Sequence, residues 1–293
     1  MFMGGQKGAP YYSDRIDYRN ITSTGNFSDF GNLTVARTNT GQGSASNGTR
    51  ALCCGGKIPY YDTDVIDYIT IASTGNATDF GNYTAAKQRV AGVSNNTRGV
   101  FAGGYGASPS PGNLSTMAFV TIATTGNAAY FGNLSGQAFA MAGGVSNGQR
   151  GLFAGGSQEQ SKIQYITINS NGDASNFGDL SGPSDRGMGC CGSSNDTRGI
   201  FWGGNPTTAY TIIDYVTIAS TGNATDFGDS QGVNTESSSA ANSTRSLCAG
   251  STTDGDASNI CVYVTIDTTG NSTDFGDLSE ARKVPAGTSG ADS

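Results

Sequence analysis

Histidine is absent from the 293-residue chain, and this absence removes the commonest general base and metal ligand of proteins. A Ser-His-Asp or Cys-His nucleophile is therefore excluded. Charge is also scarce, at 13 % of residues, and the net charge is −7. No basic run occurs, so we expect no nucleic-acid partner, because such a partner requires a positive field on the protein.

Long apolar runs are missing as well. None approaches the roughly twenty residues that a transmembrane helix needs. The first five residues, Met1 to Gly5, lack the charged and apolar regions of a secretory signal peptide. We therefore expect a protein made in a cytoplasm, with no membrane insertion and no export by the ordinary route.

The six cysteines show no spacing that is typical of a zinc site. Four of them form two adjacent pairs, and neighbouring residues on a strand point to opposite faces of the sheet. We interpret all six as small buried residues. They are Cys53, Cys54, Cys190, Cys191, Cys248 and Cys261.

Two short acidic stretches are the remaining candidates for binding a metal. They are Asp62-Thr63-Asp64 and Asp254-Gly255-Asp256. Each is too short to supply alone the six or more oxygens that calcium takes. We expect neither a bound metal nor a cofactor.

Proline is rare, at 7 residues, whereas glycine is abundant, at 45. Together with a hydrophobic share of only 35 %, such a composition is often a sign of disorder. Here, however, aromatic and β-branched residues recur at regular places. The glycines are therefore interpreted as turn residues of an all-β fold.

One phrase, a glycine followed by Asn or Asp and five residues later by Phe-Gly, returns six times. Its first residues are Gly25, Gly75, Gly126, Gly172, Gly222 and Gly270. Successive copies are thus 50, 51, 46, 50 and 48 residues apart. A period near fifty residues is typical of a β-propeller with one blade per repeat.

Each repeat predicts four short strands. In the best-formed copy these strands cover 89–94, 99–104, 118–123 and 131–134. The third strand alternates apolar and polar residues, as a half-buried strand does. A Thr-Gly-Asn turn precedes the fourth strand, and its glycine supplies the positive φ that a tight hairpin needs.

The repeat resembles the kelch repeat over the whole chain. The shared features are a glycine pair, the aromatic strand after it, and a Leu-x-x-Ala-Arg ending, seen at Leu33–Arg37 and Leu278–Arg282. The tryptophan of typical kelch repeats is missing, and the Phe of Asp-Phe-Gly takes its place. In sequence, the repeats most resemble the kelch-like repeats of virion and tail-fibre proteins of tailed phages, including those that infect cyanobacteria.

The two ends of the chain complement each other. Met1–Gly5 aligns with Val100–Gly104, and Val284–Gly290 aligns with the innermost strand of a blade. We therefore expect one domain over 1–293, a six-bladed propeller whose C-terminal strand joins the N-terminal blade and closes the ring. The expected blades cover 1–34 with 283–290, then about 35–84, 85–135, 136–181, 182–231 and 232–280.

Five arginines occupy one equivalent position before the second strand of a blade. They are Arg50, Arg98, Arg150, Arg198 and Arg245. We interpret these arginines as binding backbone carbonyls or neighbouring carboxylates. The alternative is a ring of cations that binds an anion on the propeller axis.

The loop between the second and third strands varies most among the copies, and variable loops on a rigid scaffold commonly carry binding. Paired tyrosines with nearby acids stand in two of these loops, and single tyrosines stand in two others. The candidate binding residues are Tyr11, Tyr12, Asp14, Tyr60, Tyr61, Asp62, Asp64, Tyr105 and Tyr210. Aromatic faces beside carboxylates suit sugars or protein surfaces. The alternative is that these tyrosines pack between blades.

The resemblance implies a non-catalytic structural protein of a virion, located in a tail, fibre or capsid appendage. Its expected partners are other virion proteins and host-surface carbohydrate. The alternative is a cytoplasmic kelch-type adaptor or a lectin-like binding module. A carbohydrate-active enzyme would need two facing carboxylates about 5–10 Å apart. We identify no such pair, because the commonest acids, such as Asp29 and Asp79, belong to the repeat and are interpreted as holding their own turns.

Overall fold

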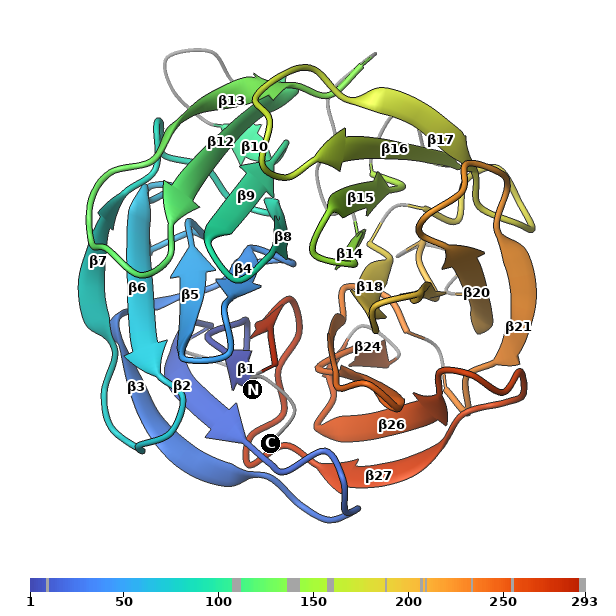
Figure 1. Ribbon diagram of the computed structural model, residues 1–293. Coiled ribbons are helices and arrows are strands. Elements are labelled where there is room, and N and C mark those ends of the chain that lie inside the picture. Colours follow the sequence, from blue (N-terminus) through green and yellow to red (C-terminus); the bar gives the residue numbers. More distant parts are fainter. Residues whose placement is uncertain are drawn as a thin grey trace.

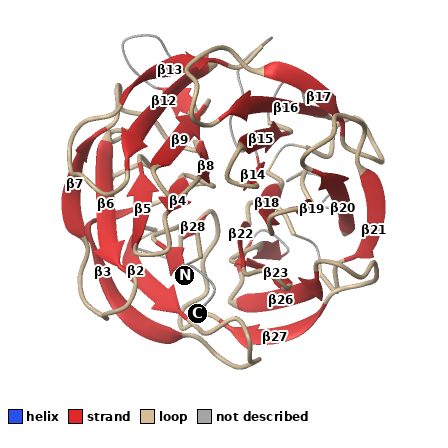
Figure 2. Ribbon diagram, viewed as in Figure 1, coloured by secondary structure: helices blue, strands red, loops and turns tan. Residues whose placement is uncertain are grey.

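The computed structural model confirms the expected fold class. It describes residues 1–8, 11–106, 112–135, 143–156, 161–187, 189–205, 208, 210–232, 234–253 and 256–289. These residues form strands and contain no helix, so no helix among them could cross a membrane. Six four-stranded antiparallel sheets stand around a central axis as the blades of a propeller (Figures 1 and 2).

The blades are numbered 1 to 6 along the chain, and their strands are given from the axis outward. Blade 1 contains β28 (Ala286–Gly287), β1 (Phe2–Met3), β2 (Ser13–Tyr18) and β3 (Ser28–Arg37). Blade 2 contains β4 (Ser44–Ser46), β5 (Arg50–Cys54), β6 (Val65–Thr70) and β7 (Thr78–Asn82). Blade 3 contains β8 (Ala91–Ser94), β9 (Arg98–Ala102), β12 (Thr116–Thr121) and β13 (Ala129–Asn133).

The second half of the ring repeats this order. Blade 4 contains β14 (Gly143–Ser146), β15 (Arg150–Ala154), β16 (Lys162–Thr167) and β17 (Ser175–Asp179). Blade 5 contains β18 (Cys191–Ser194), β19 (Arg198–Trp202), β20 (Ile212–Thr217) and β21 (Thr225–Asp229). Blade 6 contains β22 (Ser238–Ala241), β23 (Arg245–Ala249), β26 (Ile260–Thr265) and β27 (Thr273–Asp277). Two short hairpins lie in loops, formed by β10 (Tyr105–Gly106) with β11 (Gly112–Asn113) and by β24 (Thr252–Thr253) with β25 (Asp256–Ala257).

Blade 1 is shared between the two ends of the chain, as expected. The strand β28 pairs antiparallel with β1, with Phe2 opposite Gly287. The Met1 amino group donates to the Thr288 carbonyl at 2.7 Å, and the Thr288 amide donates back to the Met1 carbonyl at 3.0 Å. Figure 2 shows β28 close to the N-terminus. The expected limits of the fourth blade at 136 and of the closing segment at 290 lie outside the described residues.

The recurrent Phe-Gly phrase joins each outer strand to the turn of the next blade. The Phe side chain is buried, as at Phe30, which is 4 % exposed. The Gly75 amide donates to the Phe30 carbonyl at 2.8 Å, and the Asn76 Oδ1 accepts from the Asn32 amide at 3.0 Å. A Cβ on Gly31 would lie 2.3 Å from the Gly75 oxygen, so this position requires glycine. The same approach recurs at Gly81, Gly132, Gly178, Gly228 and Gly276.

The five equivalent arginines bind backbone carbonyls, which confirms the first interpretation, but the carbonyls belong to the following blade. The Arg50 guanidinium lies 4.5 Å from the centroid of the Tyr68 ring in its own blade. Its Nη1 donates to the Ala123 carbonyl of blade 3 at 2.9 Å. Equivalent contacts are made by Arg98, Arg150, Arg198 and Arg245. The side chains therefore reach across blade interfaces, and the alternative of an anion-binding ring on the axis is wrong.

Buried ion pairs provide a second link at three blade interfaces. The pairs are Arg37 with Asp67 at 3.1 Å, Arg282 with Asp17 at 2.7 Å, and Arg186 with Asp214. In each pair the arginine lies at the end of an outer strand or shortly after it, and the acid comes from the third strand of the next blade. The side chains are almost fully buried, so removal of one partner would leave an uncompensated charge in the interior.

Lys87 follows the outer strand of blade 2 in a similar way, but none of the described residues pairs a carboxylate with it. The Gly56 amide donates to its carbonyl at 2.9 Å, just as the Gly5 amide donates to the Arg37 carbonyl at 3.0 Å. Its side chain is 1 % exposed, and its Nζ lies 4.4 Å from the centroid of the Tyr83 ring. Burial of the ammonium lowers the pKa of Lys87 to about 8, and the nearby Cys54 opposes this shift.

The innermost strands approach one another backbone to backbone around the axis. A Cβ on Gly144 would lie 2.3 Å from the Gly92 oxygen, and a Cβ on Gly92 would lie 2.0 Å from the Ser44 oxygen. A Cβ on Gly287 would lie 2.4 Å from the Ser239 oxygen. Glycine is required at these three positions because the backbone of the neighbouring blade leaves no room for a Cβ there.

Replacement of Gly144 by alanine tests this crowding. Gly144→Ala should lower the free energy of unfolding by about 2–3 kcal/mol, because the added methyl group overpacks a rigid contact between strands. Gly222→Ala is the matched control, since a Cβ there meets nothing within 4 Å. Urea denaturation of both variants is the measurement, and equal stabilities of the two would contradict the packing described here.

Lys87 generates a prediction about pH. Its pKa is about 8 when folded and about 10.4 when unfolded, so between these values the unfolded chain binds more protons. The free energy of unfolding should therefore rise with pH from about 8 to 10.4, by on the order of 3 kcal/mol from this residue. Lys87→Met should be more stable than the parent at pH 7, and this advantage should shrink towards pH 10. Denaturant titrations of both proteins at pH 7 and pH 10 measure the difference, and a constant difference would contradict the prediction.

Candidate functional site

The propeller has two distinct faces. Because the strands are antiparallel, the loops between second and third strands lie on the same face as the links between blades. Tight turns, such as the one before Arg98, occupy the other face. We call the face with the links between blades the loop face. All of the predicted binding residues belong to it. They lie in, or next to, the segments that join β1 to β2, β5 to β6, β9 to β12 and β19 to β20.

Two neighbouring tyrosines protrude from blade 2 on the loop face. Tyr60 is 84 % exposed and Tyr61 is 71 % exposed. Their rings meet edge to face with centroids 6.3 Å apart. Tyr11 of the adjacent blade 1 is 57 % exposed. These three side chains do not pack between blades, so the packing alternative is wrong for them.

The loop that carries Tyr60 and Tyr61 is held at several points. The Ile58 amide donates to the Tyr61 carbonyl at 2.9 Å, which forms a tight turn at the tip. The Thr63 amide donates to the Gly56 carbonyl at 2.9 Å at its base. The Tyr12 hydroxyl of blade 1 donates to the Pro59 carbonyl at 3.4 Å. The tyrosines are thus presented on a loop with fixed ends.

The predicted acids have structural contacts. The Asp62 Oδ1 accepts from the Gln88 Nε2 at 3.0 Å, and the Gln88 Oε1 in turn accepts from the Asn39 amide group. Asp62 therefore ties its loop to the links that precede blades 2 and 3. Asp14 and Asp64 are half-buried, and the Asp64 carbonyl accepts from the Tyr83 amide at 2.7 Å.

The structure brings Tyr105 to the same region but not Tyr210. Tyr105 is 36 % exposed and exchanges two backbone hydrogen bonds with Gln88, at 2.8 and 3.0 Å. It therefore extends the exposed aromatic surface to blade 3. Tyr210 precedes β20 of blade 5, and this blade lies on the far side of the ring from blade 2 (Figure 1). The Tyr210 hydroxyl donates to the Asp185 Oδ1 at 3.0 Å. We call Tyr11, Tyr60, Tyr61 and Tyr105 the tyrosine surface.

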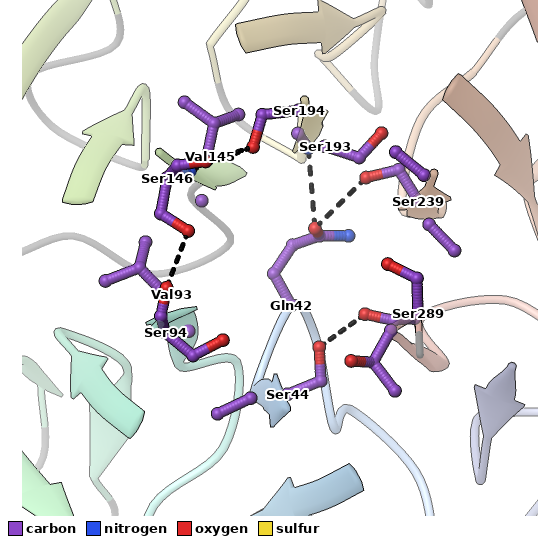
Figure 3. Close-up of a pocket in the computed structure, with 18 of the residues that line it drawn as sticks. Gln42, Ser44, Val93, Ser94, Val145, Ser146, Ser193, Ser194, Ser239 and Ser289 are labelled. Carbon is purple, nitrogen blue, oxygen red and sulfur yellow. Dashed lines mark hydrogen bonds between the residues drawn. The ribbon is translucent and has the colours of Figure 1, made fainter. Parts of the chain in front are cut away.

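A polar cavity of about 150 Å³ lies on the propeller axis (Figure 3). It is lined by the innermost strands of all six blades, and none of the described residues that line it carries a charge. Serine hydroxyls around the cavity bind the backbone of the neighbouring blade, as where the Ser146 Oγ donates to the Ser94 carbonyl at 2.9 Å. These serines lie towards the face with the tight turns.

Gln42, which the sequence analysis missed, crosses this cavity near the loop face (Figure 3). Its Nε2 donates to the Ser238 Oγ at 2.9 Å, and its Oε1 accepts from the Gly192 amide and the Ser239 Oγ, both at 3.4 Å. The side chain is 5 % exposed. One residue between blades 1 and 2 therefore contacts blades 5 and 6 on the opposite side of the axis.

The cysteines do not supply a reactive thiol. All six are buried and free, as expected. Burial raises the pKa of Cys190 to about 12, which disfavours the thiolate that a nucleophile requires. The Cys191 and Cys248 sulfur atoms approach to 3.4 Å across the interface of blades 5 and 6.

The described residues contain no group of three or more His, Cys, Asp or Glu side chains that could hold a metal ion. Asp254 and Gly255 of the second acidic stretch lie outside them. What the loop face offers is an exposed aromatic surface on firmly tied loops. Protein-family models and curated proteins were compared with the chain, and none of them matches it.

Proposed function

We propose that this protein is a non-catalytic binding component of a virion, in a tail, fibre or capsid appendage, and that it contacts its partners through the tyrosine surface. One observation carries the binding role: Tyr60 and Tyr61 are 84 % and 71 % exposed at the tip of a tied loop. The virion setting is supported by the resemblance of the repeats to those of phage virion proteins.

Tyrosine is suited to such a contact. Its ring supplies a large area at a small cost in side-chain entropy, and its hydroxyl supplies a hydrogen bond at the rim. Tyr11, Tyr60 and Tyr105 come from three successive blades, so the contact area extends along one side of the loop face. The first partner class is another virion protein, and host-surface carbohydrate is the second, since sugar rings also stack on aromatic faces.

The acids on the loop face support a binding role over a catalytic one. Asp62 accepts a hydrogen bond from Gln88, and Asp185 accepts one from Tyr210. Both carboxylates therefore hold loops in place. A glycosidase needs two carboxylates that converge on one bond of its substrate, whereas these two stand on opposite sides of the ring.

The virion setting is tested by mass spectrometry of purified particles, combined with cryo-electron microscopy of the same sample. Stoichiometric presence with ring-shaped density on a tail, fibre or capsid is the expected result. Absence from particles, with a soluble monomer in the lysate, would contradict the proposal and favour a cytoplasmic kelch-type adaptor or lectin-like module.

The tyrosine surface has its own test. The double change Tyr60→Ala and Tyr61→Ala should weaken binding at least tenfold, because aromatic anchors of this kind commonly contribute about 2 kcal/mol or more. The thermal midpoint should stay within about 1–2 °C, since both side chains are exposed. Binding is measured by biolayer interferometry against the particle protein that neighbours the loop face, and on a glycan array.

Tyr130→Ala is the matched control for this test. Tyr130 is 55 % exposed, but it lies on the outer strand of blade 3, away from the tyrosine surface. Its replacement should leave the affinity unchanged. Equal affinities of all three proteins would contradict the assignment of the surface.

A further inference from the structure

The interface between blades 5 and 6 is filled differently from the others. In the other five copies of the repeat, a large side chain stands three residues after the Phe of the Phe-Gly phrase and is buried between blades. These residues are Leu33, Tyr83, Leu134, Leu180 and Leu278. After blade 5 the same position holds Ser230. The interface between blades 5 and 6 therefore lacks a buried side chain of the size of leucine.

The buried Arg–Asp pair that links three other interfaces is also missing here among the described residues. Asn234 occupies the arginine position, because the Gly204 amide donates to its carbonyl at 2.8 Å as the Gly5 amide does to the Arg37 carbonyl. Val262 occupies the aspartate position, between Cys261 and a tyrosine, as Asp67 stands between an isoleucine and a tyrosine. Thus a leucine, an arginine and an aspartate are replaced by a serine, an asparagine and a valine.

Two of these three positions, Asn234 and Val262, line a pocket of about 250 Å³, and the third residue, Ser230, accepts a hydrogen bond from the Asn234 side chain. Its lining includes Asn234, Val262, Ile260 and Asp274. Ile260 is 53 % exposed, so the pocket has an apolar wall that reaches solvent. The pocket is on the opposite side of the ring from the tyrosine surface, and its role goes beyond the function proposed above.

The chemistry of the lining indicates the ligand. Val262 and Asp274 are paired across β26 and β27, so a carboxylate stands beside an apolar floor. Asp274 is exposed and has no ion-pair partner in the described part of the chain. The Asn234 side-chain amide and serine hydroxyls add polar contacts to the wall. A planar cation on a hydrocarbon stem complements such a site, because its stem covers apolar surface while its head meets the carboxylate.

We propose that this pocket binds a guanidinium group carried on a short hydrocarbon chain. At three other interfaces the corresponding space is occupied by the chain's own arginine, as by Arg282 beside Asp17. An arginine side chain of a partner protein and a free alkylguanidine share this chemistry.

Titration with n-butylguanidinium, followed by protein NMR, tests the proposal. The expected dissociation constant is on the order of millimolar, the range of a small fragment. The neutral isostere n-butylurea should bind at least tenfold more weakly. N-acetyl-arginine-N-methylamide distinguishes the two sources: binding as tight as that of butylguanidinium indicates an arginine within a peptide, and weaker binding indicates a free small guanidine.

Two variants locate the site. Ser230→Leu restores the side chain found in four other copies, and it should weaken binding at least tenfold without lowering the thermal midpoint. Asp274→Asn should weaken binding about fivefold, as for an exposed ion pair. Asp226→Asn is the matched control, because it removes the equivalent acid from blade 5, outside the pocket. Equal binding of butylurea and butylguanidinium, or binding that neither Ser230→Leu nor Asp274→Asn reduces, would overturn the proposal.

Discussion

The close approach of the innermost strands is the constraint on which the rest of this propeller depends. The Gly92 oxygen lies only 2.3 Å from the position of a Cβ on Gly144, so neighbouring blades touch through their backbones at the axis. Blades that meet there must diverge outward, and large side chains are needed to fill the widening gaps. The Phe of the Phe-Gly phrase, the arginines that lie over tyrosine or phenylalanine rings, and the buried Arg–Asp pairs fill and tie these gaps.

Much of this architecture could be predicted from the sequence because it is periodic. The spacing of the Phe-Gly phrase predicts the number of blades, and the complementary ends predict the pairing of β28 with β1. Contacts that occur once could not be predicted in this way. Gln42 meets Ser239 at a separation of 197 residues, and Asp17 meets Ser279 at a separation of 262 residues. No local pattern indicates such partners, since they become neighbours only when the ring closes.

The candidate site was predicted in part for the same reason. The variable loops indicated the tyrosines, and Tyr60 and Tyr61 are exposed on the loop face. The role of Asp62 was not foreseen, because its partner Gln88 lies in the next link between blades. Both sites proposed here lie where the repeat is broken, by added tyrosines on blades 1 to 3 and by lost large side chains between blades 5 and 6. Repeated positions maintain the ring, and the departures from the repeat are available for binding.

Closure of the ring is the central claim, and hydrogen–deuterium exchange of the amides in β1 and β28 tests it most directly. The Thr288 amide bonds to the Met1 carbonyl, and Phe2 pairs with Gly287, so both strands should be protected. The account predicts that their protection equals that of β14, the continuous inner strand of blade 4. Rapid exchange of β1 and β28, with β14 protected, would show that the ring is open and would contradict the account.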